Sequence, residues 1–192
     1  MRTTDVDILM VPGWSGSGPD HWQSRWQRNL KTARRVEQED WDRPDKDKWV
    51  GNIIREVAAS ARPAVLVAHS LGVHAVALAA EKLPKGAVSG AFLVAAPDIE
   101  NPQDFPADIR DAWPAGGFGF RPLPMQKLNF PSLLLASTDD PYSRIERSRE
   151  IAAAWGSGLI EIGAAGHVNA ASGHGPWPDG VLHFGGFLKQ IG

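Results

Sequence analysis

Short strand-like runs recur along the chain, and longer segments with helical spacing separate them. The runs cover residues 6–11, 35–40, 64–68, 88–96, 132–137 and 158–162. Helices are expected over 21–30, 46–60, 71–83, 143–155 and 181–191. Strands that alternate with helices are typical of a parallel sheet covered on both faces, and such buried strands read as continuous apolar runs. We therefore predict an α/β fold with a mostly parallel sheet of about six strands.

Length and charge narrow the class of protein. A chain of 192 residues fits a single domain, 1–192, that buries its own core. The net charge of −2 and the lack of basic clusters argue against a nucleic-acid or anionic-membrane partner. The chain has no cysteine, which excludes disulfides and a thiol nucleophile. No signal peptide or membrane span is visible, so a cytoplasmic protein with a small-molecule partner is expected.

A serine stands where the most strand-like segment gives way to the most helix-like one, in 64-AVLVAHSLGVHAVALAAEKL-83. Ser70 has a small residue two positions before it, Ala68, and another two positions after it, Gly72. A nucleophilic serine on a strained strand-to-helix turn needs small residues there, although the first is usually glycine. The alternative is that Ser70 only caps the helix that begins at Leu71. We favour the nucleophile elbow of the α/β-hydrolase fold.

A serine hydroxyl needs a base and an acid that orients the base. In this fold the acid and then the histidine follow the serine, each on a loop after a later strand. Asp139 and Asp140 follow the run 132–137, although an Asp-Asp-Pro sequence also suits a helix N-cap. His167 follows the run 158–162.

His174 and His183 are alternatives for the base. No strand precedes His174, and His183 lies inside the last expected helix, so neither is as well placed as His167. The histidines show no metal-binding spacing, and we expect neither a metal nor a cofactor.

Four blocks in the same order resemble the small single-domain serine hydrolases of the α/β-hydrolase superfamily, a group that includes the YdeN-like proteins and retinoblastoma-binding protein nine. The blocks are 12-PGWSGSGPDHWQSRW-26, 68-AHSLG-72, 137-STDDPY-142 and 166-GHVNAASGHGPWPDG-180. The resemblance implies Ser70 as nucleophile and His167 as base. It implies Asp140 as the acid, with Asp139 as a possible substitute.

The loop after the first strand, Pro12-Gly13-Trp14, corresponds to the loop that supplies one backbone N–H of the oxyanion hole in this superfamily. By position, the two donors are the N–H groups of Trp14 and Leu71. A glycine turn that merely ends the strand would look the same. Gly13, His69 and Trp177 lie within the quoted blocks and are candidates for substrate binding.

The segment 97–131 breaks the alternation, since it is rich in proline, glycine and aromatic residues and has no period. Long loops of this kind are usually lids or binding loops, and the aromatic residues argue against a solvated tail. We expect a lid or substrate-lining loop. Most of the tryptophans are expected in the core or on buried helix faces, namely Trp22, Trp26, Trp41, Trp49 and Trp155, whereas Trp14 and Trp177 are candidates for pocket walls.

These features predict a serine hydrolase that forms an acyl-enzyme on a small ester, as a carboxylesterase does. Its activity should fall on acidification as the base becomes protonated. A peptidase or thioesterase would use the same triad on an amide or thioester. A hydrolase-fold protein that only binds a ligand is the alternative from another class, because fold does not imply function.

Overall fold

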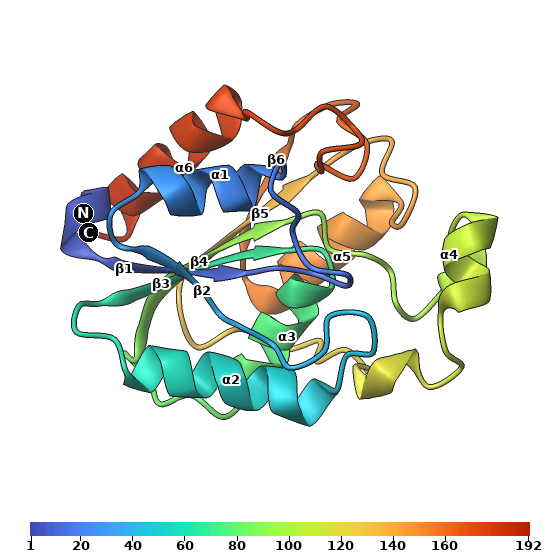
Figure 1. The fold of residues 1–192 in the computed structure, drawn as a ribbon, viewed down its shortest axis with the longest axis horizontal. Helices are drawn as coiled ribbons and strands as arrows, with labels where there is room; N and C mark the ends of the chain where they lie inside the picture. The colour runs from blue at the N-terminus through green and yellow to red at the C-terminus, as the bar shows by residue number, and fades with distance from the viewer.

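A single six-stranded sheet forms the centre of the molecule (Figure 1), in a computed structural model that describes residues 1–192. The strands are β1 (Asp7–Val11), β2 (Ala33–Arg35), β3 (Ala64–His69), β4 (Val88–Val94), β5 (Ser132–Ala136) and β6 (Gly158–Glu161). Their order is β2-β1-β3-β4-β5-β6, and every neighbouring pair is parallel. The predicted α/β fold is confirmed.

Helices cover both faces of the sheet (Figure 1). One face packs against α1 (Trp22–Asn29) and α6 (Pro178–Gln190), and the other packs against α2 (Lys46–Ala58), α3 (Leu71–Ala80) and α5 (Ile145–Trp155). Successive strand residues point to opposite faces, so they contribute alternately to two apolar clusters. None of the helices is both long enough and apolar enough to cross a bilayer.

The tryptophans expected in the core lie there. Four are buried, namely Trp22, Trp26, Trp49 and Trp155, while Trp41 is half-buried and packs edge-on against Trp49.

The second strand differs from its prediction. The run 35–40 shares only Arg35 with β2, which consists of three half-buried residues at the edge of the sheet. Pairing with β1 defines this strand, because Ala33, Arg34 and Arg35 lie opposite Ile8, Leu9 and Met10. A short, half-buried edge strand carries no apolar run, so its position could not be predicted from the residue pattern.

The segment 97–131 folds over the carboxyl end of the sheet through short helical turns. These are η2 (Pro102–Asp104), α4 (Ala107–Ala112) and η3 (Gly117–Gly119), and α4 stands apart from the sheet in Figure 1. Aromatic contacts anchor the segment, since the Trp113 ring lies 5.5 Å from the Trp14 ring and 5.3 Å from the Phe118 ring. Phe120 is fully buried.

Candidate active site

Ser70 occupies the sharp turn between β3 and α3. Its backbone has φ +55° and ψ −130°, a conformation that a residue with a side chain adopts at a cost of about 1–3 kcal/mol. Its side chain makes no capping hydrogen bond to the helix. The helix-cap alternative is therefore wrong, and the strained turn exposes the hydroxyl at the carboxyl end of the sheet.

Close packing against the end of β1 explains the small residues around this turn. A Cβ on Gly72 would collide with the carbonyl oxygens of Val11 and Pro12. A Cβ on Gly13 would lie 2.7 Å from the Ser70 Cβ and 3.1 Å from the Leu71 nitrogen. Larger side chains at either glycine would separate the β1 loop from the serine turn.

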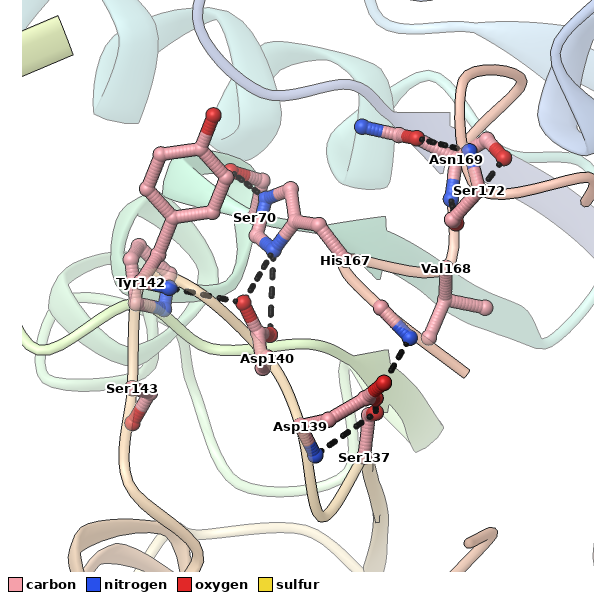
Figure 2. A network of polar contacts seen from close by, with 12 residues as sticks. Ser70, Ser137, Asp139, Asp140, Tyr142, Ser143, His167, Val168, Asn169 and Ser172 are labelled. Atoms are coloured by element: carbon pink, nitrogen blue, oxygen red, sulfur yellow. Dashed lines mark hydrogen bonds and ion pairs between the residues drawn. The ribbon is translucent and has the colours of Figure 1, made fainter. Parts of the chain in front are cut away.

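Ser70, His167 and Asp140 form a continuous hydrogen-bonded row (Figure 2). The Ser70 Oγ lies 2.9 Å from His167 Nε2, and His167 Nδ1 lies 3.0 Å from both carboxylate oxygens of Asp140. Because an ionised carboxylate only accepts, Nδ1 carries the proton, and Nε2 is left to accept from the serine hydroxyl. The side chains of His167 and Asp140 are 9% and 3% exposed, which keeps water away from their pairing.

The two aspartates of the β5 loop make different contacts. Asp140 also accepts from the backbone N–H of Tyr142 at 2.9 Å, and it does not cap α5, which begins after Arg144. Asp139 accepts from the Ser137 hydroxyl and from the Gly166 N–H, both at 2.7 Å, and these bonds hold its pKa below the usual value. Asp139 thus joins the two loops, whereas Asp140 reaches the imidazole ring.

The geometry of the β1 loop suits two backbone donors beside Ser70. Leu71 is the first residue of α3, so its N–H has no acceptor inside the helix. The N–H of Trp14 makes no hydrogen bond within the protein. Gly13, between the loop and the turn, brings these two segments together.

A cavity of about 420 Å³ opens at the serine. Four of its lining residues are Ser70, Leu71, His69 and His167, and two aromatic side chains, Trp14 and Tyr142, line it as well. The segment 97–131 supplies four further lining residues, Pro97, Phe105, Ile109 and Trp113. No lysine or arginine lines the cavity, and its one carboxylate, Asp20, forms an ion pair with Arg25 at 2.9 Å.

Two of the three candidates for substrate binding lie outside this cavity. Trp177 is buried in the apolar layer under α1, with its ring 5.1 Å from that of Trp22, and it does not line the cavity at Ser70. The sequence places Trp177 in the same block as His167, but it does not show which way the indole ring points. Gly13 contacts Ser70 from behind and does not line the cavity, whereas His69 does.

The alternative histidines do not reach the serine. His174 contacts Ser172 through Nδ1 at 3.2 Å, and His183 lies on α6. Only His167 has a ring nitrogen within hydrogen-bonding distance of the Ser70 hydroxyl.

Two imidazoles whose pKa values are lowered, those of His69 and His21, lie near the candidate triad. Burial, and then the neighbouring His167, lowers the pKa of His69 well below its ordinary value. Burial likewise lowers the pKa of His21 to about 4. The ring of His69 lies 4.9 Å from that of His167 and 4.7 Å from that of His21. Positive charge that develops on His167 therefore meets no competing cation among its histidine neighbours.

Sequence reasoning did not single out Tyr142. The Tyr142 ring packs edge-on against His167 at 4.3 Å, and burial raises the pKa of its hydroxyl, with smaller contributions from Asp108 and Asp140. Tyr142 follows the Asp-Pro pair directly, and this adjacency is the signal that could have identified it. No group of three or more His, Asp or Glu side chains is arranged to hold a metal ion.

An all-parallel sheet with a strained serine at the end of its third strand defines the α/β-hydrolase class. The chain belongs to the serine hydrolase family, whose pattern matches residues 8–185.

Solved structures place the fold in the same class. A YdeN-like hydrolase from Pectobacterium atrosepticum is 32% identical, with a TM-score of 0.82 over 98% of this chain and 94% of that one. The ydeN gene product of B. subtilis (18% identity, TM-score 0.71, 96% and 97% coverage) shares the fold. So does Est1E from Butyrivibrio proteoclasticus (12% identity, TM-score 0.69, 97% and 87% coverage). No curated protein matches the chain.

Proposed function

We propose that this serine hydrolase is a carboxylic ester hydrolase that acts on small neutral esters through Ser70, His167 and Asp140. The observation that carries the proposal is the unbroken row from the serine hydroxyl to the buried carboxylate, with contacts of 2.9 and 3.0 Å, in which Ser70 and His167 line a cavity. The row has the order and spacing that nucleophilic attack by the serine requires.

Acylation begins when the Ser70 oxygen attacks the ester carbonyl carbon and its proton passes to His167 Nε2. Asp140 holds the imidazole in the Nδ1–H tautomer and stabilises the imidazolium that forms. As the tetrahedral intermediate collapses, Nε2 returns the proton to the leaving alkoxide, and the alcohol departs. The acyl group remains as an ester on Ser70.

Deacylation repeats these steps with water. His167 takes a proton from water, the resulting hydroxide adds to the acyl carbon, and the proton returns to Ser70 as the acid leaves. In both halves, the backbone N–H groups of Trp14 and Leu71 would donate to the oxyanion. Such donors act most strongly where charge develops in a site that excludes water.

The cavity sets the proposed substrate class. Four aromatic residues, Trp14, Phe105, Trp113 and Tyr142, contribute to its walls, and no lysine or arginine lines it. Its volume of about 420 Å³ suits short or medium acyl groups. We assign the segment 97–131 as the substrate-lining loop, because four of its residues face this space.

Hydrolysis of p-nitrophenyl butyrate tests the proposal. The wild type should release p-nitrophenol with saturation kinetics, and Ser70→Ala should lose about four orders of magnitude in kcat or more. A matched panel with an anilide and a thioester of the same acyl group separates esterase from peptidase or thioesterase activity. Folded wild-type protein that hydrolyses none of the three would contradict the proposal and favour a protein that binds ligands without turnover.

A further inference from the structure

The base of the triad lies on a segment that is fixed at four consecutive residues, Ala165 to Val168. Side chains from the β5 loop hold its first half, where the Ser137 hydroxyl accepts from the Ala165 N–H at 2.9 Å and Asp139 accepts from the Gly166 N–H at 2.7 Å. Both bonds join loops that already belong to the candidate triad, and Figure 2 shows how close these side chains lie to His167.

Two side chains outside the triad hold the second half. His69 Nε2 lies 2.8 Å from the main-chain oxygen of His167, and Trp22 Nε1 donates to the main-chain oxygen of Val168 at 2.9 Å. His69 ends β3 and Trp22 begins α1, so two further elements of the fold converge on the base. A carbonyl oxygen only accepts, which places the proton of His69 on Nε2.

This segment is strained, which explains why it needs so many contacts. Gly166 has φ +55°, and Val168, a β-branched residue, has φ +50°. A β-branched residue in the left-handed region is an outlier that persists only where its surroundings determine it. Val168 is fully buried, so water cannot replace a lost partner of its carbonyl group.

Resting on the proposed function, we propose that His69 and Trp22 are positioning residues that hold the strained base segment so that His167 Nε2 faces the Ser70 hydroxyl. His69 is the more direct of the two, because it precedes Ser70 in the chain and bonds the backbone of His167. It therefore ties the nucleophile and the base to one another independently of the bond between their side chains. Neither residue exchanges a proton with substrate in this role.

The role predicts a change in kcat rather than in KM. When a holding bond is lost, the segment relaxes from its strained backbone conformation and carries the imidazole away from Ser70. A displacement of about 1 Å at a catalytic group costs about 100-fold in rate. Trp22 does not line the cavity, so a Trp22 variant should retain substrate binding. His69 does line it, so its role is tested by the contrast between two His69 variants.

His69→Leu and His69→Gln form the first pair of variants. Leucine removes the donor, whereas the glutamine amide keeps an N–H donor on a side chain of similar reach. We expect His69→Leu to lose about 10–100-fold in kcat, and His69→Gln to stay within about threefold of the wild-type kcat.

Trp22→Phe and Trp155→Phe form the second pair. Each removes one buried indole donor to a main-chain oxygen, since Trp155 Nε1 donates to Pro124 at 2.7 Å, far from the cavity. Trp22→Phe and Trp155→Phe should lose similar amounts of thermal stability, because each loses one hydrogen bond. Only Trp22→Phe should lower kcat, by about tenfold, and Trp155→Phe should leave kcat unchanged. This pair keeps the proposal testable if His69→Leu fails to fold.

The outcomes separate this inference from the proposed function. If the wild type hydrolyses p-nitrophenyl butyrate and kcat falls only in His69→Leu and Trp22→Phe, the positioning role is supported. Equal losses of kcat in His69→Leu and His69→Gln, or in the two tryptophan variants, would overturn it while leaving the esterase proposal intact. A wild type that is inactive on every ester would instead contradict the proposed function.

Discussion

Gly13 and Ser70 lie so close together that no side chain fits between them. A Cβ on Gly13 would stand 2.7 Å from the Ser70 Cβ and 3.0 Å from the main-chain oxygen of His69, and such a contact forces the backbone to shift. Gly13→Ala should therefore separate the β1 loop from the serine turn and displace the Trp14 N–H. We predict a loss of about 100-fold or more in kcat, as when one oxyanion donor is removed, measured with p-nitrophenyl butyrate.

Gly51→Ala is the matched control for this substitution. Gly51 lies within α2, and a Cβ there would contact nothing within 4 Å. Alanine also has the higher helix propensity, so this variant should gain about 0.5–1 kcal/mol of stability and keep full activity. Full activity in Gly13→Ala as well would show that the contact with Ser70 does not set the geometry of the site.

Adjacent aspartates offer a test of the acid. Asp140→Asn should lower kcat by about 10⁴-fold, because the amide can present its N–H₂ group to Nδ1 and favour the wrong tautomer. Asp139→Asn keeps an oxygen that can accept from Gly166, so it should lose about tenfold or less. The two rates are compared in folded variants of equal concentration. A larger loss in Asp139→Asn would move the role of the acid to Asp139.

Trp113 limits the length of the substrate in this account. Its ring lines the cavity and packs edge-on against Trp14, so removing it should enlarge the space next to Trp14. We predict that the wild type prefers p-nitrophenyl butyrate to the decanoate in kcat/KM, and that Trp113→Ala shifts this preference toward the decanoate by about tenfold. Met125→Ala changes an exposed residue of the same segment outside the cavity and should keep the wild-type preference. A wild type that prefers the decanoate would contradict the small cavity.

His74 makes stability depend on pH. Burial lowers its pKa from 6.5 to about 4, although the bond from Nε2 to the Pro97 oxygen opposes this effect. Well above pH 6.5 the His74 imidazole is neutral in both the folded and the unfolded protein. As the pH falls toward 4, only the unfolded chain takes up the proton, and folding loses about 2–3 kcal/mol on this account.

His74→Gln keeps an N–H donor for Pro97 but cannot titrate in this range. Urea denaturation at pH 7.5 and 4.5 should therefore show a smaller loss of stability in His74→Gln than in the wild type. His21, whose pKa is also about 4, remains in both proteins and contributes equally. An identical pH dependence in the two proteins would mean that His74 accepts a proton in the folded state.

Much of the sheet and the order of the candidate triad could be predicted from the sequence, because both depend on local patterns. Buried parallel strands read as apolar runs, and their carboxyl ends share one edge, so residues that follow β3, β5 and β6 meet there. The strand β2 could not be placed, since pairing with β1 alone defines its three residues. The segment 97–131 has no regular apolar pattern, so its fold could not be predicted either. Its shape depends on contacts with residues that are distant in the sequence.

Individual side chains were harder to predict than the elements that carry them. Trp177 and His69 both lie within site blocks in the sequence, yet one ring turns into the core and the other lies at the cavity. Which way a ring turns depends on the neighbours that packing supplies, in this case Trp22 for the first and His167 for the second.

Labelling with a fluorophosphonate probe tests the central claim most directly, because the probe reacts with an activated serine whatever the natural substrate. The purified wild type and Ser70→Ala are treated in parallel and the adduct is located by mass spectrometry. We predict one adduct, on Ser70, that is absent from the variant. A folded wild-type protein that stays unlabelled, or one that carries the adduct on another residue, would contradict the assignment of Ser70 as the nucleophile.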